Sequence, residues 1–153
     1  MADFESTVTV NRPVEQVFEF LLRPANVVKI SPPSVGLQFT SAPDVIEVGS
    51  RLEFKMQAYG QVLSFLHEIT LIDRPHKIVE KQAKGMFQKW VHEHVLESTP
   101  NGQTVIVDRI DFVPPGGLLG LLMTKVRIIE QLDDAYFHRN KQLKKLLEAA
   151  SHA

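Results

Sequence analysis

Two histidines separated by one residue are the strongest chemical feature of the sequence. His92 and His94 flank Glu93, and Asp108 follows further along the chain. An imidazole beside a carboxylate can move protons near neutral pH, which is the chemistry that enolisation, aldol closure and dehydration require. The same residue types can bind a divalent metal or orient an oxygen atom of a ligand. Which chemistry applies depends on the elements that carry these side chains.

The overall composition excludes several classes of site. The 153 residues include no cysteine, so thiolate nucleophiles, disulfides, zinc fingers and iron–sulfur clusters are ruled out. The formal net charge is −1, which does not favour a nucleic-acid-binding protein. Hydrophobic residues make up 44% of the chain, enough to form the core of a single domain spanning residues 1–153.

No segment predicts export or stable insertion into a membrane. Residues 1–7 contain neither the basic region nor the apolar stretch of a signal peptide. The longest apolar run, Leu118–Met123, is far shorter than the roughly 20 residues that span a bilayer. We expect this run to pack on the sheet as a loop and first helical turn; a flexible apolar gate and a contact with a membrane surface are the alternatives. The expected location is the cytoplasm.

The order of predicted elements indicates an α+β fold. A short strand at residues 7–10 precedes a helix that starts at residues 11–13, with Pro13 in its first turn, and a second short helix or loop over residues 25–30. Strands then dominate, with alternating apolar and polar residues expected at 51–58, 62–71, 77–84, 86–98 and 103–113. A long helix is predicted over residues 118–149. The sequence therefore predicts an antiparallel sheet whose apolar face is covered by one long helix.

The predicted C-terminal helix has a stripe that is not uniformly apolar. Residues recurring every three or four positions form this stripe, namely Leu122, Val126, Ile129, Asp133, Tyr136, Asn140, Leu143 and Leu147. Asp133 and Asn140 interrupt it, which indicates that part of the helix faces a polar or hollow space. Tyr136 lies on the same stripe and is a candidate for lining that space.

The hairpin around residues 100–102 determines where the histidines lie. A two-residue turn would place His94 opposite Arg109 and would mix polar and apolar faces. A three-residue loop, with its glycine in the left-handed bulge position, places His94 opposite Asp108 and separates the faces. Because a half-buried sheet needs one consistent apolar face, we predict the three-residue loop. His92, His94 and Asp108 then share the helix-covered face.

Four segments carry a recognisable pattern: Val8–Phe18, Gly85–His94, Gly102–Thr104 with Asp108-Arg109, and Pro115–Gly120. Together they resemble one subgroup of the START, polyketide cyclase–dehydrase and pollen-allergen superfamily (SRPBCC), over nearly the whole chain. The resemblance implies a helix-grip fold, in which a curved antiparallel sheet of about six or seven strands wraps around a long C-terminal helix and two short helices follow the first strand. The superfamily includes lipid carriers, aromatase/cyclases, hormone receptors, chaperone activators and oxygenase domains, so fold does not determine function.

The resemblance also implies a cavity between the sheet and the C-terminal helix. The residues that it places around this cavity are Trp90, His92, His94, Asp108 and Tyr136, with Phe54, Met56, Phe65 and His67 as additional candidates. Such a cavity suits a hydrophobic small molecule, such as a lipid, polyketide or isoprenoid, whose oxygenated group meets the polar residues. His67 is interpreted as a packed strand residue, and His76, His138 and His152 as ordinary surface histidines.

Three interpretations of the polar residues stay open. His94 and Asp108 can form a buried pair that satisfies both groups, or the residues can form the polar end of a ligand pocket. The third interpretation, a metal site of two histidines and Asp108, is disfavoured because the histidine Cα atoms stand about 6.5–7 Å apart along one strand. No alternative ligand set supports a metal, so we expect neither a metal nor a cofactor.

Three functions follow from these interpretations. The leading hypothesis is binding or transport of a hydrophobic, partly oxygenated small molecule by a monomer or homodimer. The second is a polyketide cyclase or dehydratase, with His94, Asp108 and His92 as catalytic candidates. The third is a non-enzymatic interaction protein that regulates a partner, with the cavity filled by side chains.

Overall fold

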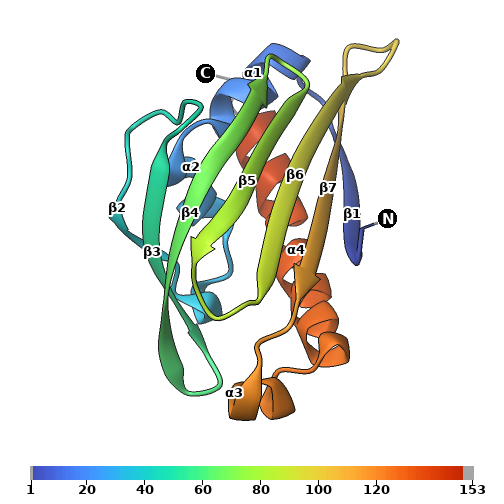
Figure 1. Ribbon diagram of the computed structural model, residues 1–153. Coiled ribbons are helices and arrows are strands. Elements are labelled where there is room, and N and C mark those ends of the chain that lie inside the picture. The colour runs from blue at the N-terminus through green and yellow to red at the C-terminus, as the bar shows by residue number, and fades with distance from the viewer. Residues whose placement is uncertain (1, 150–153) are drawn as a thin grey trace.

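The computed structural model describes residues 2–149, and these form a curved antiparallel sheet with helices on its inner side (Figure 1). The strands are β1 (Phe4–Val10), β2 (Gln38–Ser41), β3 (Arg51–Ala58), β4 (Gln61–Asp73), β5 (Lys77–Lys84), β6 (Lys89–Ser98) and β7 (Thr104–Val113). The helices are α1 (Val14–Leu21), α2 (Pro24–Ile30), the 3-10 turn η1 (Pro33–Val35), α3 (Gly117–Leu122) and α4 (Lys125–Ala149). The strand order across the sheet is β1-β7-β6-β5-β4-β3-β2, which confirms the predicted helix-grip fold.

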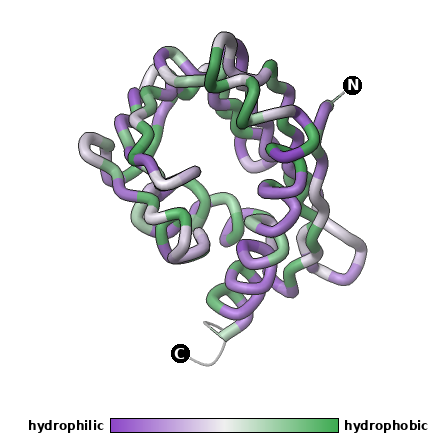
Figure 2. The backbone as a smooth tube through the Cα atoms, turned by 90° about the horizontal axis from the view of Figure 1, so that it is seen from below, coloured by the Kyte–Doolittle hydropathy of each residue, from purple (hydrophilic) through white to green (hydrophobic). Residues whose placement is uncertain are grey.

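Two short helices after β1 close one end of the sheet. Pro13 precedes α1, and Pro24 occupies the first turn of α2, where its fixed backbone angle suits a helix start. The buried residues of α1 recur at helical spacing and are Val14, Val17, Phe18 and Leu21. Helix α4 packs against both β1 and α2, and Figure 2 shows from below how the sheet and the helices together form a ring.

The apolar core has two parts, and residues of both line one cavity. The larger part joins α1 and the C-terminal half of α4 to the sheet, with Phe18 and Leu143 among its buried members. The smaller part lies around Phe112, Ile128 and Tyr136. This division leaves the N-terminal half of α4 beside the cavity, where polar side chains can face it.

The hairpin between β6 and β7 has the predicted register. His94 pairs with Asp108, and His92 pairs with Ile110 on the neighbouring strand. Gly102 has a φ angle of 77°, the left-handed conformation that a three-residue loop requires at this position. The residues of the turn and the alternation of apolar and polar residues in the strands therefore specify the same register.

The C-terminal helix differs from the prediction in continuity and in its buried face. It is broken at Met123, whose backbone is not helical, so α3 and α4 are separate helices. The buried residues of α4 are Ile128, Tyr136, Arg139, Leu143 and Leu147. Asp133 is exposed, so its predicted place on the buried stripe is wrong. Steps of three and of four residues both continue a helical face, and the observed face passes through Leu132 and Arg139 where the predicted stripe passed through Asp133 and Asn140.

The apolar run Leu118–Met123 packs on the core only in part, through Leu119 and the buried Met123. Helix α3 has no buried residue, and Leu118 and Leu121 are 84% and 75% exposed. The segment Pro114-Pro115-Gly116 follows β7 and leads the chain away from the sheet (Figure 1). Among residues 2–149, no helix combines the length and the apolar composition needed to cross a membrane.

Candidate functional site

Three adjacent strands and one helix bring polar side chains to a single wall of the cavity. Side chains alternate across a strand, so Glu80 shares the inner face of β5 with the buried Ile78. In β6 the same alternation places His92 and His94 on the inner face, opposite Ile110 and Asp108 of β7. Helix α4 adds Tyr136 and Arg139, which are three residues apart and face the sheet together. We call Glu80, His92, His94, Asp108, Tyr136 and Arg139 the polar wall.

Asp108 is the centre of the polar wall and is 1% exposed. Its Oδ1 atom accepts a hydrogen bond from His92 Nε2 at 2.9 Å. His94 Nδ1 lies 2.7 Å from the same oxygen, in an ion-pair contact whose angle departs from that of a hydrogen bond. Arg139 Nη2 lies 3.9 Å from this oxygen. One carboxylate oxygen therefore holds the positions of both histidine rings.

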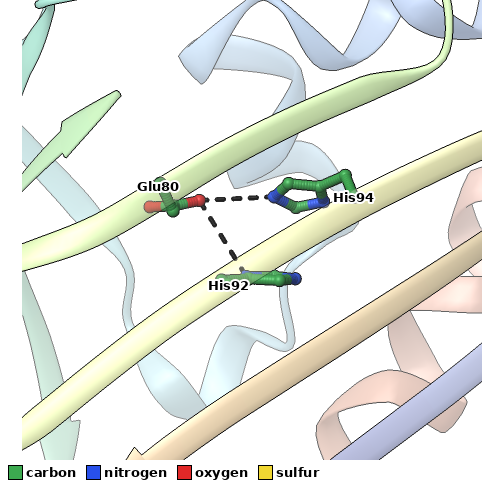
Figure 3. A group of neighbouring side chains, drawn as sticks. All are labelled: Glu80, His92 and His94. Carbon is green, nitrogen blue, oxygen red and sulfur yellow. Dashed lines mark hydrogen bonds and ion pairs between the residues drawn. The ribbon is translucent and has the colours of Figure 1, made fainter. Parts of the chain in front are cut away.

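Glu80 faces the two histidines from β5 (Figure 3). Its Oε1 atom lies 3.4 Å from His94 Nε2 and 3.9 Å from His92 Nδ1. Its Oε2 atom accepts a hydrogen bond from His67 Nδ1 at 2.8 Å. Each imidazole of the pair thus has one nitrogen toward Asp108 and the other toward Glu80.

Burial and charge shift the pKa values of the two histidines in opposite directions. Burial, reinforced by the charge of His94, lowers the pKa of His92 to about 4 despite its hydrogen bond to Asp108. Burial alone would also lower the pKa of His94, but the charge of Asp108 and the contacts with Asp108 and Glu80 outweigh it and raise that pKa. At neutral pH His92 is therefore neutral, while the raised pKa favours the protonated form of His94.

The two carboxylates of the polar wall stay ionised. Burial opposes ionisation of Asp108. The positive charges of Arg139 and His94 and the contacts that Asp108 makes with both histidines outweigh burial and hold the pKa of Asp108 well below the ordinary value. Burial likewise opposes ionisation of Glu80, and the hydrogen bonds from His67 and His94 lower its pKa well below the ordinary value. Protonated His94 and Arg139 balance these two negative charges, so the buried wall is electrically neutral.

Tyr136 keeps a proton that it can donate to a ligand. Burial raises the pKa of Tyr136 well above its ordinary value, so the phenol remains protonated. Because ionised Asp108 only accepts, neutral His92 carries its proton on Nε2, and the Tyr136 hydroxyl oxygen, 3.0 Å away, accepts from that same N–H. The Tyr136 O–H itself is then available as a donor.

Arg139 also has an unused donor. Its guanidinium lies 5.1 Å from the centre of the Tyr136 ring, and the side chain lines the cavity. Its Nε atom is buried and has no hydrogen-bond partner among the residues that the structure describes. A buried donor without a partner is costly, so a ligand oxygen at this position would satisfy it.

The cavity beside the polar wall has a volume of about 290 Å³, and the rest of its lining is mostly apolar. Its lining includes all the candidates predicted around the cavity except Asp108, which lies behind the histidines: Phe54, Met56, Phe65, His67, Trp90, His92, His94 and Tyr136. Trp90 packs on Phe87 and Phe112, with ring centres 4.6 and 5.8 Å away. The structure thus brings polar and aromatic candidates into one cavity, where His67 contacts the Phe54 ring and hydrogen-bonds Glu80.

The remaining histidines have separate surroundings. His67 is packed in the sheet as expected, but it also hydrogen-bonds Glu80 and lines the cavity. His76 is exposed and contacts the carbonyl of Leu96, whereas His138 is half-buried on α4. His152 lies outside the described residues.

Two residues of the polar wall, Glu80 and Arg139, are missing from the sequence prediction. The alternation of β5 contains the signal for Glu80, because buried Ile78 lies two residues before it. The signal for Arg139 is its distance of three residues from Tyr136 and four from Leu143, which places all three on one helix face.

A family model described as "Polyketide cyclase / dehydrase and lipid transport" matches residues 1–148. Among curated proteins, none matches the sequence. The family match covers every element described above except the last residue of α4.

Solved structures share the fold at low sequence identity. A protein from Thermus thermophilus is 16% identical with a TM-score of 0.73, covering 97% of this chain and 98% of its own. Zhui aromatase/cyclase from a Streptomyces species is 19% identical with a TM-score of 0.66, covering 92% and 87%. A major latex-like protein from Panax ginseng is 15% identical with a TM-score of 0.63, covering 93% and 94%. These likenesses concern the fold alone.

Proposed function

The chain belongs to the polyketide cyclase / dehydrase and lipid transport family, and we propose that it binds a hydrophobic, partly oxygenated small molecule in its cavity. The observation that carries this proposal is an apolar cavity of about 290 Å³ with charged and polar groups on one wall. Binding pockets commonly measure roughly 300–1,000 Å³, so the cavity suits a compact ligand. Lipids, polyketides and isoprenoids are the candidate classes.

The apolar side of the cavity supports a ligand with a flat or branched hydrocarbon part. Phe54 and Phe65 stack with ring centres 5.2 Å apart, and Trp90 adds a further aromatic surface. Met56 is half-buried beside them, and its flexible thioether can adapt to an irregular ligand. On this side of the cavity, the shape of the apolar surface would restrict the size of the ligand. It would restrict the chemical groups of the ligand much less.

The polar wall supports recognition of one oxygenated group. The Tyr136 O–H and the partnerless Arg139 Nε are donors, so they suit a carboxylate, enolate or carbonyl oxygen. We propose that the ligand lies with its hydrocarbon part toward Phe54 and Phe65 and its oxygen toward these two donors. We also propose that the protein acts in the cytoplasm as a monomer or homodimer.

The proposal is tested by filling the cavity. Ala135 lines the cavity from α4, and an Ala135→Phe variant places a ring in the ligand volume. Native mass spectrometry and solvent extraction of the wild-type protein should yield a bound apolar compound, and the variant should retain less than a tenth of it. Ala83→Phe is the control because Ala83 is exposed. No bound compound in the wild type, together with no binding of hydrophobic probes, would contradict the proposal.

A cyclase or dehydratase is the second candidate function, and one observation favours it. His94 lines the cavity between two carboxylates, an arrangement that allows a histidine to donate and recover a proton. If the protein is such an enzyme, His94→Gln should lose at least about a hundredfold in turnover with little change in ligand affinity. Equal loss of turnover and affinity would assign His94 to binding.

The third hypothesis, a regulatory interaction protein, requires that side chains fill the cavity. The described residues leave about 290 Å³ open, which supports the ligand-binding proposal rather than this one.

A further inference from the structure

Three side chains of the polar wall direct metal-ligating atoms toward one another. Glu80 approaches from β5, and His92 and His94 approach from β6 (Figure 3). One atom of each, Glu80 Oε1, His92 Nδ1 and His94 Nε2, lies within 4.8 Å of the other two. Ligands on one tetrahedral ion, each about 2.1 Å from it, stand about 3.4 Å apart. The His94–Glu80 distance of 3.4 Å already matches this value.

The atoms that face away from this point are held by other side chains. His92 Nε2 and His94 Nδ1 both lie against Asp108 Oδ1, at 2.9 and 2.7 Å. Glu80 Oε2 accepts from His67 Nδ1 at 2.8 Å. In metal sites, a histidine ligand typically donates its other ring N–H to a carboxylate, which orients the ring and leaves its lone pair toward the metal. All three side chains here have such an outer partner.

The two carboxylates of the polar wall also allow a cation to be held at this point. The carboxylates of Glu80 and Asp108 have one permanent cation beside them, the Arg139 guanidinium, so a metal ion would replace the proton that His94 otherwise carries. Buried charge of this kind must be offset by a partner. Replacing that proton with a divalent ion would change the net charge of the polar wall from zero to one positive charge, which would attract an anionic oxygen of the cavity ligand.

We propose that Glu80, His92 and His94 bind a divalent transition-metal ion, such as Zn²⁺ or Fe²⁺, with Asp108 and His67 orienting the ligands. Two histidines and one carboxylate leave coordination positions open, and all three ligand side chains line the cavity. The sequence prediction of no metal considered only Asp108 as the third ligand. Glu80, from the neighbouring strand, supplies the carboxylate instead.

Wild-type protein is first made metal-free with a chelator. It is then titrated with Co²⁺ while the visible spectrum is recorded, and finally Zn²⁺ is added to displace the Co²⁺. We expect one Co²⁺ per chain with a spectrum typical of mixed nitrogen and oxygen ligands. Glu80→Gln should weaken Co²⁺ binding at least about a hundredfold, and Asp108→Asn about 10–100-fold. Glu93→Gln, on the other face of β6, should change the affinity less than twofold.

Circular dichroism of each variant separates metal loss from unfolding. A second measurement needs no variant: the melting temperature of the wild type should rise with Zn²⁺ concentration, because a ligand that binds the folded state stabilises it. Absence of stoichiometric Co²⁺ binding by the wild type, or equal affinity in folded Glu80→Gln, would overturn the proposal. The metal titration contains no organic ligand, so a negative result would not contradict the proposed binding of an apolar molecule. That proposal is tested separately with the Ala135→Phe variant.

Discussion

The wall of the cavity formed by β5, β6, β7 and α4 contains charged side chains that contact one another, whereas Phe54, Met56 and Phe65 of β3 and β4 form an apolar wall of side chains that pack. His67 of β4 lies between the two walls, because it contacts the Phe54 ring and hydrogen-bonds Glu80. On the first wall, Asp108 contacts two histidines and an arginine, so each group depends on the others. On the second wall, Phe54 and Phe65 interact through stacking and burial. We therefore expect substitutions on the polar wall to be strongly coupled and those on the apolar wall to act through volume.

The largest expected effect is the loss of the Asp108 charge. Asp108→Asn leaves protonated His94 and Arg139 buried without their shared partner, so unfolding free energy should fall by about 3–5 kcal/mol in urea denaturation. Asp111→Asn is the matched control on the same strand, because the Asp111 side chain is 46% exposed and pairs with Lys89 at the surface. That variant should lose less than about 1 kcal/mol. Equal losses in both variants would contradict the claim that the buried groups of the polar wall depend on the Asp108 charge.

The second expected effect is a dependence of stability on pH that originates in His92. Its pKa is about 4 in the folded protein, below the ordinary value of 6.5, so the unfolded chain binds more protons between these values. Stability of the metal-free protein should therefore fall as pH decreases from 6.5 to 4, by at most about 3 kcal/mol from this residue. His92→Gln removes this contribution and should flatten the acidic part of the profile measured by urea denaturation.

His94 produces the opposite slope in a different pH range. Because its folded pKa is raised, its contribution to stability is complete below pH 6.5 and is lost as pH rises through the folded pKa. His94→Gln should therefore change the alkaline side of the profile, while His92→Gln changes the acidic side. If both variants alter the same side, the assignment of one neutral and one protonated histidine is wrong.

The smallest expected effect concerns the apolar wall. Phe65→Leu removes aromatic volume next to an existing cavity, so we expect a loss of about 1–2 kcal/mol in unfolding free energy. Ligand affinity should change gradually with the size of the ligand, without a change in pH dependence. A large pH-dependent effect in this variant would show that the two walls are coupled.

The fold was predictable from the sequence where local rules agree with one another. Strand alternation and the chemistry of the Pro100–Gly102 loop both lead to the His94–Asp108 pairing, because a shift by one residue would expose the apolar face. The resemblance to a known superfamily added the curvature of the sheet and the cavity, which local patterns do not encode.

The full polar wall was less predictable, for two physical reasons. The inner face of β5 contains Glu80 and Gln82 after Ile78, so apolar alternation is too weak there to show which side chains face inward. Arg139 was missed because steps of three and of four residues both continue a helical face, and the predicted stripe took Asn140 in its place between Tyr136 and Leu143. The mutual contacts of Glu80 with three histidines arise only when β4, β5 and β6 are paired.

The claim that one wall recognises oxygen while the other accepts hydrocarbon is tested most directly with a pair of probes of similar shape. Calorimetry or fluorescence titration compares 2-naphthoic acid with 2-methylnaphthalene on the wild-type protein. We expect the acid to bind at least tenfold more tightly, and Arg139→Met, verified as folded, to lose this preference while keeping its affinity for the hydrocarbon. Equal affinity of the wild type for both probes, or no binding of either, would contradict the account.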